Sequence, residues 1–138
     1  MLYELIYRST AKPGLTESDL KDILRTAHSF NKSNDITGCL LYHEGQFLQM
    51  LEGEFQVLLE LYDRIKRDPR HREFLLMHMK ETEYRIYSNW TMAFKSLERT
   101  DLKNYSGVSE FTELESYDEE SSMSLNLFHA ISESFIED

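Results

Sequence analysis

Hydrophobic residues along the first hundred positions alternate between strand spacing and helix spacing, and the order of these stretches restricts the fold. Strand-like alternation appears at residues 2–9, 36–53, 73–83 and 85–96, and helical spacing at residues 17–32 and 54–68. His43, Glu44, Gly45 and Gln46 divide the second strand-like stretch in two, which is typical of a hairpin. The order β-α-β-β-α-β-β predicts an α+β, ferredoxin-like fold with a mixed five-stranded sheet and both helices on one face.

The C-terminal part of the chain differs from the rest in charge. Residues 101–138 hold one Lys or Arg against ten Asp or Glu, and the formal net charge of the chain is −10. Such a surface disfavours nucleic acid and anionic membranes as partners. An apolar stripe (Leu125, Leu127, Phe128, Ile131 and Phe135) predicts a final helix within residues 121–137. We therefore expect a domain at residues 1–97 and an acidic helical extension at 98–138.

Several classes of protein and of site receive no support from the sequence. No apolar run is long enough for a membrane span, and residues 1–9 do not resemble a signal peptide, so we expect a cytoplasmic protein. The single cysteine, Cys39, excludes an internal disulfide and is expected to be a small strand residue. The five histidines lack metal-ligand spacing, and His28 and His43 are expected at the surface.

Three polar residues occupy positions where apolar ones are expected. Gln49 lies between Phe47 and Leu51 on one face of a predicted strand, although a buried amide costs free energy unless it is hydrogen-bonded. Tyr7 ends the buried face of the first strand, and Asn31 stands beside the apolar stripe of the first helix. In the expected topology the first and third strands are neighbours, so Tyr7 and Gln49 can lie side by side.

Each of these residues also has an ordinary interpretation. Tyr7 alone is typical of a core tyrosine with its hydroxyl at the rim, Asn31 of a helix end, and Gln49 of an edge amide facing water. Together, a phenol and two carboxamides between two helices indicate a hydrogen-bonding pocket for a flat ring with polar edges. Composition and spacing do not identify that ring.

Five stretches in register resemble one known family. They are "LIYRS", "DLKDIL" with "FNKSNDITGCLLY", "FLQMLEG", "RIKRDPRH" and "NWTMAF", and they extend from Leu2 to about Phe94. The sequence resembles the BLUF domains, sensors of blue light using FAD. The resemblance implies FAD as cofactor, with its isoalloxazine ring between the two helices.

The resemblance also implies roles for the three polar residues. Tyr7 matches the photoactive tyrosine that gives an electron and a proton to the excited flavin. Gln49 matches the glutamine that bridges tyrosine and flavin, and whose hydrogen bonds rearrange after illumination. Asn31 matches the asparagine that bonds the polar edge of the ring. Ile23 and Ile65 match the aliphatic residues that sandwich it.

Further positions follow from the same match. Asp68, Arg70 and His71 correspond to a polar loop that bonds the pyrimidine edge and the ribityl chain, although a solvated turn remains an alternative for His71. Trp90 and Met92, expected on the last strand, match a pair that competes for the place beside Gln49. Which of the two lies there is left open by the sequence.

The resemblance implies a photoreceptor that is not itself an enzyme. The signal would leave through the last strand and the C-terminal extension to a downstream effector protein, and we expect a homo-oligomer. The alternatives are a small flavin-dependent oxidoreductase, or a ferredoxin-like binding module that has lost its flavin. The colour of the protein and its turnover of NAD(P)H in the dark distinguish the three.

Overall fold

The computed structural model describes residues 1–114 and 122–135. Its elements are β1 (Leu2–Ala11), α1 (Glu17–Ser33), β2 (Thr37–His43), β3 (Gln46–Glu54), α2 (Phe55–Ile65), β4 (His71–Glu81), β5 (Ala93–Ser96), α3 (Arg99–Ser106), η1 (Phe111–Glu113), α4 (Met123–Ser132) and η2 (Glu133–Phe135). The five strands form one sheet in the order β4-β1-β3-β2-β5. Only β2 and β5 pair in parallel, so the predicted mixed, ferredoxin-like sheet is confirmed.

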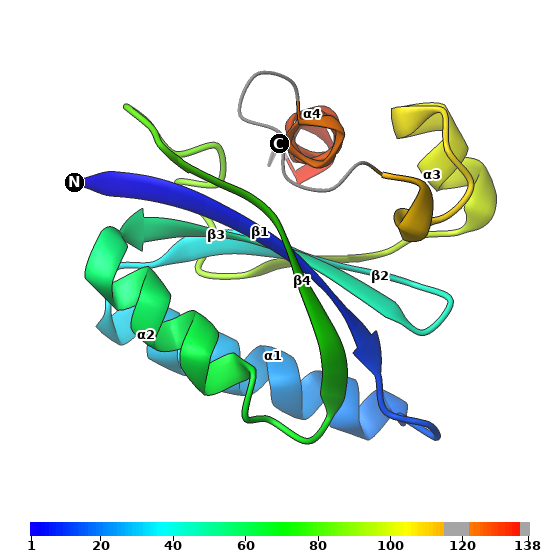
Figure 1. The fold of residues 1–138 in the computed structure, drawn as a ribbon, viewed down its shortest axis with the longest axis horizontal. Coiled ribbons are helices and arrows are strands. Elements are labelled where there is room, and N and C mark those ends of the chain that lie inside the picture. The colour runs from blue at the N-terminus through cyan, green and yellow to red at the C-terminus, as the bar shows by residue number, and fades with distance from the viewer. Residues whose placement is uncertain (115–121, 136–138) are drawn as a thin grey trace.

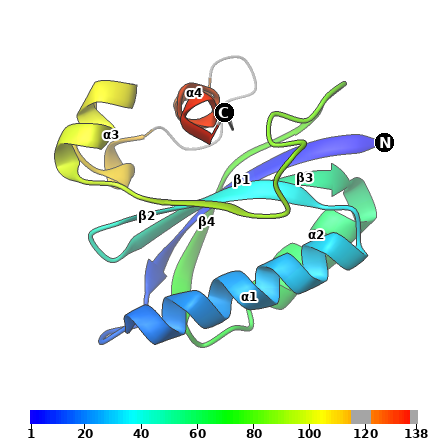
Figure 2. The same ribbon diagram turned by 180° about the vertical axis from the view of Figure 1, so that it is seen from behind.

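The sheet separates two layers of helices. Helices α1 and α2 cover one face, and α4 lies over the other, as both Figure 1 and Figure 2 show. We call these the α1–α2 face and the α4 face. Alternate residues of each strand enter the two cores: the first core contains Leu5, Tyr7, Phe47, Leu51 and Leu58, and the second contains Ile6, Leu48, Met50, Phe111 and Phe128.

Local signals position α1. The Thr16 hydroxyl accepts the backbone N–H of Asp19 at 3.0 Å, and the Asp19 carboxylate accepts the backbone N–H of Thr16 at 3.0 Å. This capping box satisfies two N–H groups that the helix itself leaves unpaired, so the predicted start of the helix is confirmed.

The predicted hairpin between β2 and β3 is confirmed, but His43 is not at the surface. Glu44 and Gly45 both have positive φ, as a tight two-residue hairpin turn requires. The His43 side chain is buried, with Nδ1 2.8 Å from the carbonyl oxygen of Leu97 and Nε2 3.1 Å from that of Ser109. The chain after β5 folds back over the hairpin and covers this histidine. Cys39, in contrast, is the small buried strand residue that was expected.

The last predicted strand is shorter than expected. Only Ala93–Ser96 pairs with β2, whereas residues 85–92 form an irregular segment. The carboxylate of Glu52 accepts the backbone N–H groups of Ile86 and Tyr87, and the N–H of Trp90 returns to the carbonyl of Tyr87 at 2.9 Å. These bonds replace a strand ladder. Trp90 and Met92 therefore precede β5 and do not lie on it.

The C-terminal residues add helices to the α4 face. The apolar stripe predicted within residues 121–137 forms α4 and η2, and Leu127, Phe128 and Ile131 are buried against the sheet. Helix α3 was not predicted. Residues 115–121, which hold part of the acidic run, and 136–138 lie outside the described residues. The boundary between residues 97 and 98 stays a prediction.

Candidate functional site

A cavity of about 300 Å³ opens between α1, α2 and the sheet. All eight residues predicted to bind a cofactor line it: Tyr7, Ile23, Asn31, Gln49, Ile65, Asp68, Arg70 and His71. They come from β1, β3, both helices, the loop after α2 and the start of β4. A volume of this order suits a small-molecule ring.

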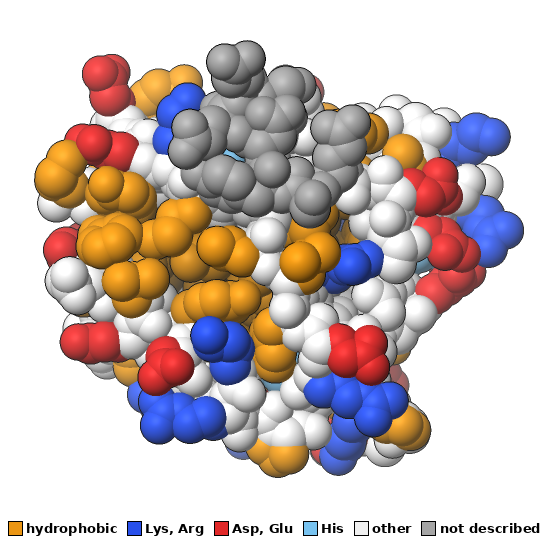
Figure 3. Space-filling view, viewed as in Figure 1, with side chains coloured by type: hydrophobic (Ala, Val, Ile, Leu, Met, Phe, Trp, Pro, Cys, Tyr) orange, Lys and Arg blue, Asp and Glu red, His pale blue; other side chains and the backbone are white. Residues whose placement is uncertain are grey.

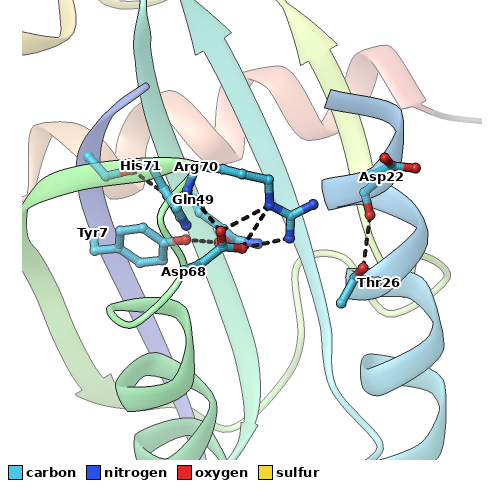
Figure 4. Close-up of polar contacts among 8 residues, drawn as sticks. Tyr7, Asp22, Thr26, Gln49, Asp68, Arg70 and His71 are labelled. Atoms are coloured by element: carbon cyan, nitrogen blue, oxygen red, sulfur yellow. Dashed lines mark hydrogen bonds and ion pairs between the residues drawn. The ribbon is translucent and has the colours of Figure 1, made fainter. Parts of the chain in front are cut away.

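The register of β1 and β3 brings Tyr7 and Gln49 together. The two residues are directly paired across the antiparallel strands, and the Tyr7 hydroxyl donates to Oε1 of Gln49 (Figure 4). Both side chains are buried, with exposed fractions of 1% and 5%. Burial above all, together with Tyr62 and Asp68, raises the pKa of the Tyr7 phenol well above its ordinary value. Tyr7 is therefore a neutral donor that holds the Gln49 carboxamide in one orientation.

The other end of the Gln49 carboxamide faces Met92. Its Nε2 donates to the Met92 sulfur at 3.4 Å, and Met92 is only 2% exposed. Trp90 lies on the α4 face, where its ring centroid is 5.6 Å from that of Phe135. The structure thus resolves the choice that the sequence left open, because Met92 is the residue beside Gln49.

Asn31 carries a buried acceptor without a partner. Its Nδ2 donates to the carbonyl oxygen of Thr91 at 2.7 Å, whereas Oδ1 has no hydrogen-bond partner although the residue is 1% exposed. Leaving a buried acceptor unpaired costs roughly 1–3 kcal/mol. An N–H donor from a bound molecule would satisfy it, and an oxidised isoalloxazine ring presents one such N–H among several acceptors. The residues present therefore fit a flavin.

The apolar walls of the cavity come from the inner faces of the two helices. Ile23 of α1 and Ile65 of α2 both line it and are only half-buried. Ala27, one turn after Ile23, adds a small side chain to the same wall. Apolar groups on both helices with polar groups at the sheet suit a flat ring with polar edges.

A pair of opposite charges closes one end of the cavity. The Arg70 guanidinium donates to both oxygens of Asp68, with Nη2 to Oδ2 at 2.6 Å, and the Arg70 backbone N–H adds a further bond at 2.9 Å (Figure 4). Burial alone would raise the pKa of Asp68, but these bonds hold it below its usual range. The carboxylate is therefore ionised and fixed toward the cavity.

His71 is the first residue of β4 and is buried, so the alternative of a solvated turn is wrong. Its Nδ1 lies 3.0 Å from the hydroxyl oxygen of Ser9. Burial is the main cause that lowers the pKa of His71 from 6.5 to about 4. A neutral imidazole at this place offers one ring nitrogen as donor and the other as acceptor.

Other residues of the cavity were not predicted as part of the site: Thr26, Phe30, Leu40, Phe47, Leu61, Arg64 and Arg67. Helical spacing provides a signal for some of them, because Thr26 and Phe30 lie three and seven positions after Ile23. The guanidinium of Arg64 stands 4.7 Å from the centre of the Phe30 ring, which joins the two helices at the cavity. Nothing in the local sequence distinguishes Arg64 from the other surface arginines.

Comparisons with known proteins agree with this site. A family model described as sensors of blue light using FAD matches residues 2–93. The photoactivated adenylate cyclase subunit beta of Euglena gracilis is 41% identical over 92 residues, which are 66% of this chain and 11% of that protein. The chain thus spans about a tenth of the length of the curated relatives it matches.

Two solved structures extend the comparison. The dark-state structure of BlrB, a BLUF protein, superimposes with a TM-score of 0.82 at 29% identity and covers 97% of each chain. Klebsiella pneumoniae BlrP1, solved with FMN and cyclic diGMP, gives a TM-score of 0.65 at 36% identity over 70% of this chain and 26% of that one. The fold, the cavity and the family match agree, and the chain belongs to the BLUF family of blue-light sensors that use FAD.

Proposed function

We propose that this chain senses blue light through the Tyr7–Gln49 pair and passes the signal to a separate effector protein. The observation that carries the proposal is the buried hydrogen bond from Tyr7 to Gln49 in a cavity that also holds the unpaired carbonyl of Asn31. Bound FAD would supply the absorption of blue light and an acceptor for one electron and one proton. Asn31, Asp68, Arg70 and His71 would hold its polar groups, and Ile23 and Ile65 its ring faces.

The residues of this chain then perform the response. Tyr7 gives up an electron and its phenolic proton, which removes the donor that fixes Oε1 of Gln49. The carboxamide of Gln49 can then rearrange, because among the described residues its two ends are held by Tyr7 and the sulfur of Met92. A changed contact with Met92 acts on the irregular segment before β5. Neutral Tyr7 is the required starting state, and its raised pKa supports this.

The same segment connects the cavity to the α4 face. Met92 contacts Gln49, whereas the Tyr87 hydroxyl donates to the carbonyl oxygen of Phe128 at 2.7 Å and Trp90 packs against Phe135. We propose that light shifts this segment and thereby α4 and η2. The acidic side of the extension would meet the partner.

The relatives suggest the kind of output but not its identity. Photoactivated adenylate cyclase is a cyclase, and BlrP1 was solved with cyclic diGMP. Because residues 2–93 match a family of light sensors, we propose that this chain acts as a sensor and not as an enzyme. We propose the cytoplasm as its compartment. Among the described residues no helix has the length and hydrophobicity of a membrane span.

Self-association is part of the proposal. Large hydrophobic side chains are exposed on β4 and α2, with Leu75 38% and Leu59 36% exposed, and Figure 3 shows hydrophobic side chains gathered on this side of the molecule. Light scattering after size-exclusion chromatography, in the dark and in blue light, measures whether the chain forms a homo-oligomer. A monomer at all concentrations would contradict this part alone.

The decisive experiment is an absorption spectrum before and after blue light, with mass spectrometry of the released chromophore. We expect bound FAD and a reversible red shift. A protein that cannot be reconstituted with any flavin contradicts the proposal, and so does steady turnover of NAD(P)H in the dark, which indicates an oxidoreductase. FMN or riboflavin in place of FAD would change the cofactor but not the mechanism.

Amide hydrogen exchange in dark and light tests the output. We expect faster exchange in α4 and η2 after illumination, because the Tyr87 hydroxyl donates to the Phe128 carbonyl and Trp90 packs against Phe135. If exchange in residues 101–138 is the same in both states while the spectrum shifts, the signal leaves through another surface.

A further inference from the structure

One buried carboxylate on the α4 face does not belong to the cavity. Glu52 of β3 has no exposed surface and lies on the same face of the sheet as the core residues Leu48 and Met50. Its Oε1 accepts the hydroxyl of Thr37 at 2.9 Å and the backbone N–H of Tyr87 at 3.0 Å, and its Oε2 accepts the backbone N–H of Ile86 at 2.5 Å. Both oxygens are thus hydrogen-bonded within the protein.

The geometry needs a carboxylate. Two successive backbone N–H groups point at one side chain, an arrangement that favours an anion. An amide of the same shape has one acceptor and would turn its NH₂ group toward an N–H. Burial raises the pKa of Glu52, whereas the bonds from Ile86, Tyr87 and Thr37 and the charge of Arg85 oppose that rise. The fold therefore keeps a costly group here where an apolar residue would pack more cheaply.

Arg85 strengthens the same attachment. Its guanidinium donates to the Glu52 carbonyl oxygen at 3.1 Å and to the Thr37 hydroxyl at 3.0 Å. The second nitrogen donates to the Asp35 carbonyl oxygen at 2.9 Å. Residues 85–87 are in this way fastened to the beginning of β2 and to the end of β3.

The opposite end of the segment is attached to the cavity. The Thr91 carbonyl accepts from Asn31, the Met92 sulfur accepts from Gln49, and the Trp90 carbonyl accepts from the backbone of Gly38 at 3.1 Å. Between the two ends lie the contacts of Tyr87 and Trp90 with the C-terminal helices. A displacement of Met92 reaches those contacts only if residues 85–87 stay fixed. If residues 85–87 were also free to move, the segment would shift as a whole and the contacts with the C-terminal helices would not change.

We propose that Glu52 is a positioning residue for the light response, fixing residues 86 and 87 so that a change at Met92 is transmitted to Tyr87, Trp90 and the C-terminal helices. This inference rests on the proposed function. It assigns to Glu52 a part in transmission and none in flavin binding, because Glu52 does not line the cavity. The two parts of the light response can therefore be separated.

The test uses Glu52→Gln in the full chain with its flavin. The only tryptophan of the protein is Trp90, so its fluorescence reports this segment alone. We expect an unchanged red shift in absorption, whereas the light-induced change in Trp90 fluorescence falls roughly tenfold, since losing one hydrogen bond to a charged group loosens the attachment by about that factor. Amide exchange in α4 should lose its light dependence in parallel.

Thr37→Val is the matched control. It removes the Thr37 hydroxyl from the same carboxylate and one bond of Arg85, but it leaves both backbone N–H groups their acceptor and Arg85 its bonds to Asp35 and to the Glu52 carbonyl. Valine preserves the shape of threonine. We expect it to lower stability while retaining the fluorescence change. If Thr37→Val and Glu52→Gln lose the change equally, general loosening explains the result and the inference is wrong.

A second variant covers the case in which Glu52→Gln does not fold. Arg85→Met leaves the Glu52 carboxylate in place and removes the Arg85 bonds to Asp35, to the Thr37 hydroxyl and to the Glu52 carbonyl. A reduced light-induced change in Trp90 fluorescence with a normal red shift supports the inference. If every one of these two variants that folds keeps the fluorescence change of the wild type, the inference is wrong. Absence of a red shift in the wild-type protein would instead contradict the proposed function itself.

Discussion

The two faces of the sheet are built from the same strands, yet they differ in how their polar groups are treated. On the α1–α2 face a cavity remains, the Tyr7–Gln49 pair is buried, and one carbonyl of Asn31 is left unpaired. On the α4 face apolar side chains pack beneath α4 and the buried Glu52 carboxylate is hydrogen-bonded, while Nδ1 of the buried His78, whose Nε2 pairs with Glu4, lacks a partner. Because strand residues alternate between faces, neighbours such as Ile6 and Tyr7 serve different purposes. The first face therefore leaves room for a ligand, and the second buries apolar side chains that stabilise the fold.

Changing the Tyr7–Gln49 pair on the α1–α2 face should have the most severe consequence for the light response. Tyr7→Phe removes the phenolic O–H and Gln49→Leu removes the carboxamide, and both roughly keep the volume. We expect each variant to fold, to bind flavin and to lose the reversible spectral shift completely. Absorption spectroscopy under blue light measures it. A normal red-shifted state in either variant contradicts the assigned roles.

The packing of the α4 face can be tested by a substitution that creates a cavity. Phe128 has no exposed surface, and Phe128→Ala should lower the free energy of unfolding by about 3–5 kcal/mol. Ile23→Ala, on the wall of the open cavity, should cost only about 1–2 kcal/mol, because the removed atoms already border empty space. Urea denaturation of both variants without flavin gives the two values. Equal losses would show that the faces do not differ in this way.

Acid should affect the α1–α2 face first. The folded pKa of His71, about 4, lies below its ordinary value of 6.5, so the unfolded chain binds a proton more readily. Stability from neutral His71 is present above pH 6.5 and is lost as pH falls to 4, by about 3 kcal/mol in total. Denaturation curves at several pH values measure the slope. His71→Gln should flatten it, and an unchanged slope would exclude His71 as the cause.

The smallest effect concerns the link between the 85–92 segment and α4. Tyr87→Phe removes the hydrogen bond to the carbonyl of Phe128 and should cost about 1 kcal/mol. The red shift should stay intact, whereas amide exchange in α4 should become faster in the dark and respond less to light. If the light response of α4 in this variant equals that of the wild type, the contact of Trp90 with Phe135, and not the Tyr87 hydrogen bond, couples the segment to the C-terminal helices.

The sequence predicted the site better than the connection to the output. Alternation in β1 and β3 and the order of elements were sufficient to pair Tyr7 with Gln49, because strand period and topology are local and repetitive signals. The segment before β5 was wrongly predicted as strand, since its conformation depends on Glu52, more than thirty positions away. His43 was misplaced for a similar reason, as its cover comes from residues 97–109. Contacts between residues that are distant in the sequence do not produce a periodic hydrophobic pattern, so the local sequence does not predict them.

The burial of Cys39 decides how motion in this protein can be measured. The thiol has no exposed surface, and burial raises its pKa to about 12, so it presents almost no thiolate to a labelling reagent at neutral pH. For maleimide or nitroxide chemistry the folded chain therefore behaves as if it had no cysteine. Asn89→Cys and Asn126→Cys, both at exposed positions, could be labelled together in the otherwise natural sequence. The distance between two spin labels would then record, in dark and light, how far α4 moves from the segment that holds it.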